Sequence, residues 1–292
     1  MQDRLVSVEL TDWSVPAGYP TRSLAADLED GKVLYFPQLP FTLSDAEKPF
    51  LSPEWSDGKA KNISYDRERN QLKGAQGSPA DLERMQAMIA RYQRQAVGLI
   101  TGLFPHYKQN LRVAQTSLRT QKVEGRETSW RKDDSRLHVD AFPSRPNQGE
   151  RILRVFSNVN PAGVPRVWRV GERFADLAAR LAPKISRPIP GSAALMKALH
   201  ITKSHRSEYD HYMLHLHDMM KADPDYQANS PQLTVPFPPG ATWVCYSDQT
   251  PHAAMSGQHM FEQTLHLPAA GMYDPTAAPL GVLERVLGRA LV

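Results

Sequence analysis

The sequence predicts an α+β protein with a mainly β core, built as a double-sheet β barrel or jelly roll. Short, β-branched segments bounded by Gly, Pro and Asn form two groups, at about 107–170 and 231–268. A stretch of helical character, at about 171–230, separates the two groups. The chain also has 24 prolines among 292 residues, which favours strands joined by shaped loops over long helices. This order of elements suits two packed sheets better than a βαβ repeat.

The first hundred residues predict an early strand and one long helix. KVLYFPQLPF, at 32–41, is typical of a strand that prolines end, and the polar stretch FLSPEWSDGKAKNISYD after it predicts a loop. Ser78 and Pro79 have the character of an N-cap and a first helical residue. We expect this helix to reach about Leu103, because Pro105 ends it.

The remaining elements follow from local patterns. Consecutive strands are predicted for LRVAQTSLRTQKV, RILRVFSNVN and RVWRV, and helices for ERFADLAARL, SAALMKALHI and SEYDHYMLHLHDMMK. Strands return with LTVPFP, TWVCYSD and MFEQTLHLP. Without an internal repeat or a clear linker, we expect one domain, 1–292. It would have an N-terminal elaboration (1–106), a jelly-roll core (about 107–170 and 231–268), a helical insertion (about 171–230) and a C-terminal helix (279–292).

Composition limits the class of protein. Cys245 is the only cysteine, so no intrachain disulfide forms, and the start of the chain lacks a signal-peptide pattern. We therefore expect a cytoplasmic protein. The net charge is +4, but residues 107–173 carry fourteen Lys/Arg and seven Asp/Glu, a local excess of +7. Such a field would attract a polyanionic substrate, unless these are ordinary solvated arginines.

Two distant segments can build a metal site. His138 and Asp140, in SRLHVDAFPSRP, would project from one face of a strand, because residues i and i+2 share a face. His252, in SDQTPHAAMSG, follows the strand TWVCYS and could return a third ligand from the opposite sheet. Two His and one carboxylate form the ligand set of non-haem Fe(II) oxygenases. The alternative is a hydrogen-bonded His138–Asp140 pair with His252 in a surface turn.

Other kinds of site have weaker support. His211 and His215 are spaced to share a helix face, but the segment lacks the glutamate of H-E-x-x-H, and we expect partly exposed helix residues there. Cys245 lies in an apolar strand, where it should act as a small buried hydrophobe. The chain contains no G-x-S-x-G, P-loop or G-x-G-x-x-G, and no nucleic-acid-binding motif, so no nucleic-acid partner is expected.

Several of these segments resemble the Kdo 3-hydroxylases, enzymes that act on 3-deoxy-D-manno-oct-2-ulosonic acid (Kdo). The similarity lies in LHVDAFPSRPNQGERILRVFSNVNP, GVPRVWRVGE, SDQTPHAA and LSPEWSDGKAKNISYD, and so covers nearly the whole chain. It implies a double-stranded β-helix (jelly roll) and the cofactors Fe(II), 2-oxoglutarate and O2, with His138, Asp140 and His252 as catalytic iron ligands. The implied reaction hydroxylates C3 of Kdo in the lipopolysaccharide inner core (Kdo-lipid A), giving the 3-hydroxylated sugar, succinate and CO2.

One feature departs from the wider oxygenase superfamily. Many members hold the far carboxylate of 2-oxoglutarate with an Arg beyond the distal His, but AAMSGQHMFEQTLHL, after His252, has neither Arg nor Lys. We expect Arg154 to replace it, since it lies on an otherwise apolar face. A structural ion pair is the alternative role for Arg154. Further candidates are Asn158 and Gln263 for the cosubstrate, and Arg126, Arg145 and Gln249 for the substrate.

The implied substrate raises the question of membrane contact. PLGVLERVLGRALV predicts an amphipathic helix with Leu280, Leu283, Leu287 and Leu291 on one face. This face either packs on its own domain or touches the inner membrane peripherally. Three other functions remain open: a different 2-oxoglutarate hydroxylase, a non-catalytic jelly-roll module that binds anionic glycans, and a zinc hydrolase.

Overall fold

The computed structural model describes residues 1–125 and 128–292 and contains two sheets that pack face to face. The larger sheet has the strand order β1-β2-β9-β6-β11-β5-β3-β4, and the smaller has the order β10-β7-β8. β1 and β2 pair in parallel, and every other pair in the described residues is antiparallel.

The strands are β1 (Leu5–Ser7), β2 (Val33–Phe36), β3 (Ile63–Asp66), β4 (Gln71–Lys73), β5 (Arg112–Arg119), β6 (Arg151–Asn158), β7 (Arg166–Gly171), β8 (Gln232–Phe237), β9 (Thr242–Tyr246), β10 (His252–Ser256) and β11 (Met260–Leu267). The helices are α1 (Thr21–Glu29), α2 (Pro79–Leu103), α3 (Phe174–Leu181), α4 (Ser192–Ala198), α5 (Glu208–Ala222), α6 (Pro224–Asn229) and α7 (Pro279–Leu287).

Aromatic side chains fill the space between the two sheets. Trp243 of the large sheet stacks on Phe237 of the small sheet, with 4.1 Å between ring centroids, and Trp168 meets Trp243 edge-on. These residues are buried because the strands alternate between an inward and an outward face. The jelly-roll prediction is confirmed, and Cys245 lies buried in this layer as a free thiol.

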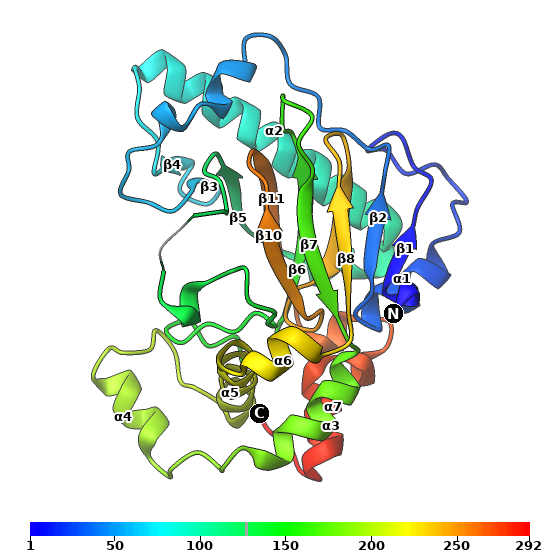
Figure 1. Cartoon of the computed structure of the whole chain (residues 1–292), viewed down its shortest axis with the longest axis vertical. Coiled ribbons are helices and arrows are strands. Elements are labelled where there is room, and N and C mark those ends of the chain that lie inside the picture. The colour runs from blue at the N-terminus through cyan, green and yellow to red at the C-terminus, as the bar shows by residue number, and fades with distance from the viewer. Residues whose placement is uncertain (126–127) are drawn as a thin grey trace.

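Helix α2 covers the outer face of the large sheet (Figure 1). It begins where the sequence predicts, because the Ser78 hydroxyl accepts the Asp81 N–H and Pro79 occupies the first turn. Its buried side chains recur at helical spacing, and the Tyr92 hydroxyl donates to the Val155 carbonyl of the sheet at 3.1 Å. The helix is therefore bonded to β6, the strand that carries Arg154.

The helical insertion forms a second layer at one end of the sheets (Figure 1). Helices α3, α5 and α7 share an apolar core there. In α7, Val282 and Leu283 are buried, and Leu280 and Leu287 pack partly against the same core. Gly288, with φ +67°, ends this helix earlier than predicted, because glycine adopts the left-handed conformation without steric cost. The apolar face of α7 thus packs on its own domain.

Several short elements differ from the sequence prediction. The stretch expected as a polar loop contains β3, which pairs with β4 and with β5. The expected strand at His138 is instead an extended segment with a single bridge to His252, and His252 begins β10 rather than lying in a turn. None of the helices in 1–125 and 128–292 is both long enough and apolar enough to cross a bilayer.

Candidate metal centre

The structure brings His138, Asp140 and His252 together between the two sheets. One potential ligand atom from each lies within 4.8 Å of the others, and no other group of three or more His, Cys, Asp or Glu in the described residues meets this criterion. The backbones of His138 and His252 exchange two hydrogen bonds, at 3.0 and 2.8 Å, and the Asp140 N–H donates to the Ser247 carbonyl at 2.8 Å. Main-chain pairing therefore sets the spacing of the three side chains.

Both imidazoles present the same nitrogen to the centre. The Nδ1 atom of His138 lies 2.7 Å from the Arg136 carbonyl, and that of His252 lies 2.9 Å from the Thr250 carbonyl. Because a carbonyl only accepts, each Nδ1 carries the proton and each Nε2 keeps its lone pair. Burial lowers the pKa of His138 and lowers the pKa of His252 to about 4, so both rings are neutral near pH 7.

The Asp140 carboxylate is ionised and incompletely satisfied. Burial raises its pKa, but the charge of Arg154 and the contact with His138 outweigh burial and hold the pKa well below the usual range. Its Oδ2 atom lies 2.8 Å from Arg154 Nη2, yet this contact lacks hydrogen-bond directionality and no other donor reaches the atom. Two neutral imidazoles and a carboxylate with a spare oxygen fit Fe(II).

Arg154 belongs to a chain of alternating charges. Its other terminal nitrogen pairs with Glu262 of β11, and Glu262 also pairs with Arg119 of β5. Burial raises the pKa of Glu262, whereas the charges of Arg119 and Arg154 lower it, and the net shift is downward. Arg154 therefore forms structural ion pairs, as in the alternative role that the sequence left open. It also lies directly beside the metal centre.

A cavity of about 160 Å³ contains the triad and is lined by unpartnered polar atoms. Four side-chain N–H groups in this cavity are buried and have no hydrogen-bond acceptor: the Nε–H groups of Arg119, Arg154 and Arg166, and the indole N–H of Trp168. Buried donors are normally satisfied, so a concentration of them in one cavity indicates a site for acceptor-rich ligands.

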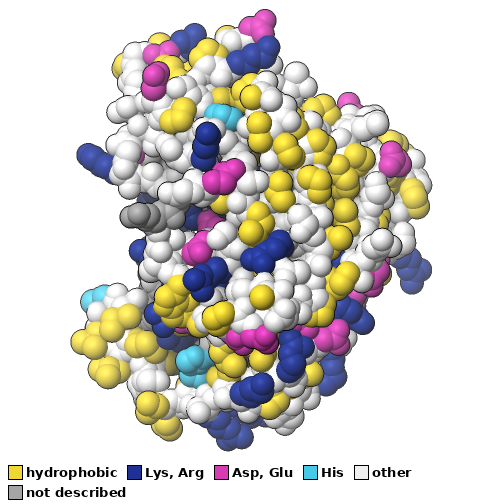
Figure 2. Space-filling model, in the orientation of Figure 1, with side chains coloured by type: hydrophobic (Ala, Val, Ile, Leu, Met, Phe, Trp, Pro, Cys, Tyr) yellow, Lys and Arg dark blue, Asp and Glu magenta, His cyan; other side chains and the backbone are white. Residues whose placement is uncertain are grey.

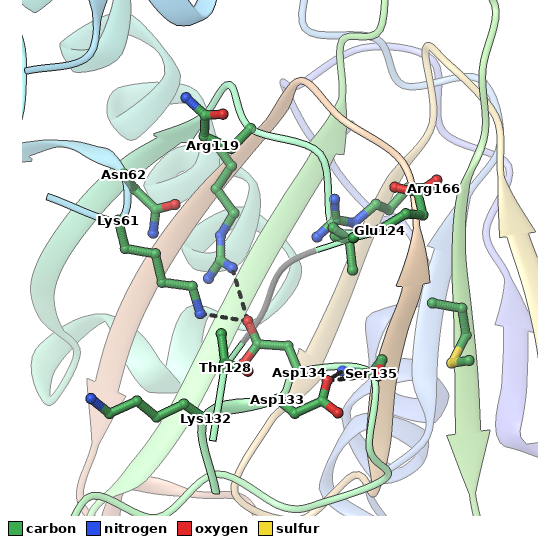
Figure 3. Close-up of a pocket in the computed structure, with 14 residues that line it drawn as sticks. Lys61, Asn62, Arg119, Glu124, Thr128, Lys132, Asp133, Asp134, Ser135 and Arg166 are labelled. Carbon is green, nitrogen blue, oxygen red and sulfur yellow. Dashed lines mark hydrogen bonds and ion pairs between the residues drawn. The ribbon is translucent and has the colours of Figure 1, made fainter. Parts of the chain in front are cut away.

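Two larger cavities share lining residues with the triad cavity. One, of about 480 Å³, is reached through Arg154 and is also lined by Arg145 and Thr264. The other, of about 280 Å³, is reached through Arg166 and is lined by Lys61 and Lys132 (Figure 3). The centre thus lies where two cation-lined cavities meet.

Arg166 is the distinctive residue of the second cavity. Its side chain is 3% exposed, and Nη1 donates to the Gly257 carbonyl at 2.9 Å, but no carboxylate in the described residues lies within ion-pair distance. By contrast, Lys61 and Arg119 both approach Asp134 (Figure 3). Burial, followed by the nearby charge of Arg119, lowers the pKa of Arg166 to about 10. It still carries a positive charge at pH 7, which Asp134, Glu262 and Glu124 offset only from beyond ion-pair distance.

The structure does not bring three of the predicted contact residues to the centre. The Asn158 amide donates to the carbonyls of Val164 and Phe237 and holds the end of β6. Gln263 points to the opposite face of β11 from Glu262, where it binds Thr116. Gln249 binds the carbonyls of Glu29 and Ala277 and accepts from Arg151. All three amides hold the scaffold.

The substrate arginines have different outcomes. Arg145 is exposed and lines the 480 Å³ cavity. Arg126 lies outside the described residues.

The helical insertion adds neighbours that sequence reasoning missed. His217 of α5 is buried and meets the His138 ring edge-on, with 5.4 Å between centroids, whereas His211 contacts the Ser186 carbonyl away from the centre. Arg119, Arg166 and Glu262 were also missed as site residues. The only sequence signal for Arg119 and Arg166 is the local excess of arginine, and Glu262 has none, because strand alternation alone does not reveal which face meets the triad.

The comparisons with known proteins agree with this geometry. The profile of the 3-deoxy-D-manno-oct-2-ulosonic acid (Kdo) hydroxylase family matches residues 12–290. A crystal structure of the Kdo hydroxylase KdoO, a non-heme Fe(II) alpha-ketoglutarate dependent dioxygenase, in complex with cobalt(II), is 46% identical with a TM-score of 0.95. That match covers 99% of this chain and 97% of KdoO.

A second KdoO structure contains alphaketoglutarate and Fe(III). It is 45% identical, with a TM-score of 0.94 and the same coverage of both chains. No curated protein sequence matches the chain. The family match over almost the whole length, together with the close structural likeness, shows that the chain belongs to the Kdo hydroxylase family.

Proposed function

We propose that this protein is an Fe(II)- and 2-oxoglutarate-dependent dioxygenase that uses O2 to hydroxylate C3 of Kdo in the lipopolysaccharide inner core. The products would be the 3-hydroxylated sugar, succinate and CO2. One observation carries the proposal: a buried His–Asp–His centre lies between two cation-lined cavities, in a chain 46% identical to a Kdo hydroxylase. Two cavities fit a reaction in which two organic acids must reach one metal.

His138, Asp140 and His252 would hold the iron, which supplies the oxygen activation that protein side chains cannot perform. Both Nε2 atoms keep their lone pairs, and Oδ1 of Asp140 lies 3.6 Å from the Nε2 atom of His138, so the ligand atoms are close together before any metal binds. Three ligands from the protein leave the remaining positions for cosubstrate and oxygen.

We assign 2-oxoglutarate to the cavity of about 480 Å³. Arg154 would pair with the distal carboxylate of 2-oxoglutarate. Arg154 lines both the triad cavity and this cavity, and its Nε has no hydrogen-bond acceptor. Arg145 and Thr264 line the same space and offer further donors. When Arg154 turns toward the cosubstrate, Arg119 still neutralises Glu262 and the bound iron would neutralise Asp140, so neither carboxylate is left buried and unpaired.

We assign the sugar acid to the Arg166 side. In Kdo the carboxylate is C1 and the reacting carbon is C3, so a cation that binds the carboxylate must lie close to the metal. Arg166 lines both the triad cavity and the cavity of Figure 3, and it has no acidic partner in the described residues. The sugar carboxylate would form the direct ion pair that Arg166 lacks in the described residues and would orient C3 toward the centre.

The lipid context rests on charge. Lys132 lines the same cavity as Arg166 and forms no salt bridge in the described residues, which suits a substrate that carries phosphates as well as a carboxylate. We therefore infer that the substrate is Kdo-bearing lipid A, reached from the cytoplasm at the surface of the inner membrane.

The test is anaerobic reconstitution with Fe(II) and 2-oxoglutarate, followed by O2 with and without Kdo-bearing lipid A. We expect succinate release that depends on the lipid, together with a gain of one oxygen atom in the sugar. Succinate without lipid oxidation would keep the dioxygenase and reject the substrate. Bound iron with neither product would reject the enzyme.

A further inference from the structure

The segment around α4 exposes an unusual set of large apolar side chains, which we call the α4 surface. Ile189 is 76% exposed, Leu195 and Leu199 are each 60% exposed, and Ile201 is 55% exposed. Leu195 lies in α4, and Leu199, four residues further on, is the C-cap residue of this helix. Figure 2 shows hydrophobic side chains gathered on the projecting lobe at the lower left, where Figure 1 places α4. Contiguous exposed apolar groups indicate an interaction surface.

Positive charge surrounds this surface. Residues 177–207 contain six Lys/Arg and no Asp or Glu. Lys184, Arg187, Lys197 and Lys203 form no salt bridge within the described part of the chain. A helix with protruding apolar residues among unpaired cations matches the interface of an anionic bilayer, where cations meet phosphates and apolar side chains enter the headgroup and acyl boundary.

The α4 surface adjoins the mouth of the cosubstrate cavity. The Lys203 N–H donates to the Ser144 carbonyl at 3.0 Å, Arg206 donates to the Pro143 carbonyl at 2.6 Å, and Gln148 donates to the His205 carbonyl at 2.8 Å. These bonds tie the segment after α4 to the loop 142–148. Within that loop, Phe142 is 39% exposed and lines both the triad cavity and its larger neighbour.

We propose that the α4 surface docks on an anionic lipid bilayer. Ile189, Leu195, Leu199 and Ile201 enter the boundary region, and the surrounding lysines and arginines bind lipid phosphates. This role falls to α4 rather than to α7, because the apolar side chains of α7 pack within the protein. The α4 surface does not depend on the identity of the sugar.

Sedimentation with vesicles tests the proposal independently of catalysis. The vesicles contain equal parts of phosphatidylethanolamine and phosphatidylglycerol and no Kdo lipid. We expect the full-length protein to sediment with them, and L195E/L199E to bind at least about tenfold more weakly, because two apolar anchors are lost. K197Q/K203Q should bind about 25-fold more weakly, at about fivefold per cation, and high salt should reproduce this loss. L195F/L199F should retain binding.

A matched control carries the same added charge elsewhere. A162E/V164E changes exposed positions in the turn between β6 and β7, at the far end of the sheets from α4 (Figure 1), and should bind vesicles like the unaltered protein. Activity on a water-soluble Kdo glycoside should be the same for L195E/L199E and for the control. Activity on the lipid embedded in vesicles should fall only for L195E/L199E.

Three results would overturn the proposal: no sedimentation of the unaltered protein, equal binding of L195E/L199E, or self-association through this surface without vesicle binding. Failure of the soluble-substrate assay alone would instead count against the proposed reaction.

Discussion

Arg166 gives the sharpest test of how the substrate is positioned. It is buried and positively charged, it has no carboxylate partner in the described residues, and it lines the cavity that contains the triad. If the sugar carboxylate supplies the missing charge, R166M removes one charge-assisted interaction, worth about 1.5–3 kcal/mol. The KM for the sugar should then rise about 10- to 150-fold, with a smaller effect on the KM for 2-oxoglutarate.

Protein stability should change little in R166M. The variant loses the hydrogen bond from Nη1 to the Gly257 carbonyl, worth about 1 kcal/mol, but it also removes a buried cation that has no direct ion-pair partner in the described residues. These effects oppose each other, so urea unfolding should place R166M within about 1 kcal/mol of the unaltered protein. A loss of activity therefore reports on binding rather than on the fold.

The assay pairs the variant with a substrate analogue in which a carboxamide replaces the sugar carboxylate. The unaltered enzyme should discriminate strongly between acid and amide, R166M should hardly discriminate, and R166K should fall between them. Two enzymes and two substrates form a double-mutant cycle, which isolates the interaction between the Arg166 side chain and the sugar carboxylate. An equal loss on acid and amide would refute the assignment, and unchanged kinetics would do the same.

The remaining predictions test the metal, the cosubstrate and the core. D140A should lose bound iron and turnover, measured by metal analysis after gel filtration and by succinate release; full activity under saturating iron would sink the ligand assignment. R154A should raise the KM for 2-oxoglutarate about tenfold or more, with partial recovery in R154K, and a rise only in the KM for the sugar would reverse the two cavity assignments. Fe(II) at about 100 times its Kd should stabilise the fold by about 2.7 kcal/mol in anaerobic thermal unfolding, and D140A should show no such shift. L283A should lower the free energy of unfolding by about 2–5 kcal/mol, because Leu283 is fully buried; a negligible change would mean that α7 does not pack as described.

The elements with strong local signals are predicted well from sequence. Ser78, Pro79 and Pro105 bracket α2 to within a residue or two, since capping and proline geometry act locally. The jelly roll and the family are also confirmed. Both could be predicted because alternating strands and a long, specific motif are properties of the sequence itself. By contrast, β3 is only four residues long and depends on pairing with β5, so its own sequence scarcely distinguishes it from a loop.

The site shows the same division. The three ligand residues can be recognised in the sequence from their spacing and from the motif around them. The structure places one potential ligand atom of each within 4.8 Å of the others. The residues around the triad cannot be recognised in this way, because their contacts join distant parts of the chain. Arg154, for example, pairs with Glu262, which lies 108 residues further along. Gln249 and Gln263 have the chemistry of ligand contacts, but their amides are used by distant carbonyls and hydroxyls that only the fold brings near.

The two backbone hydrogen bonds between His138 and His252 have a consequence for metal exchange. Because they are formed by the main chain, folding alone orders the metal-binding side chains, and binding the ion requires no further loss of chain entropy. Small zinc domains behave in the opposite way and unfold when stripped of their ion. Here a chelator should yield an intact, reloadable apoprotein. The ion that it carries in a cell would then depend on the donor atoms and on the available pool of metals, not on which ion was present while the chain folded.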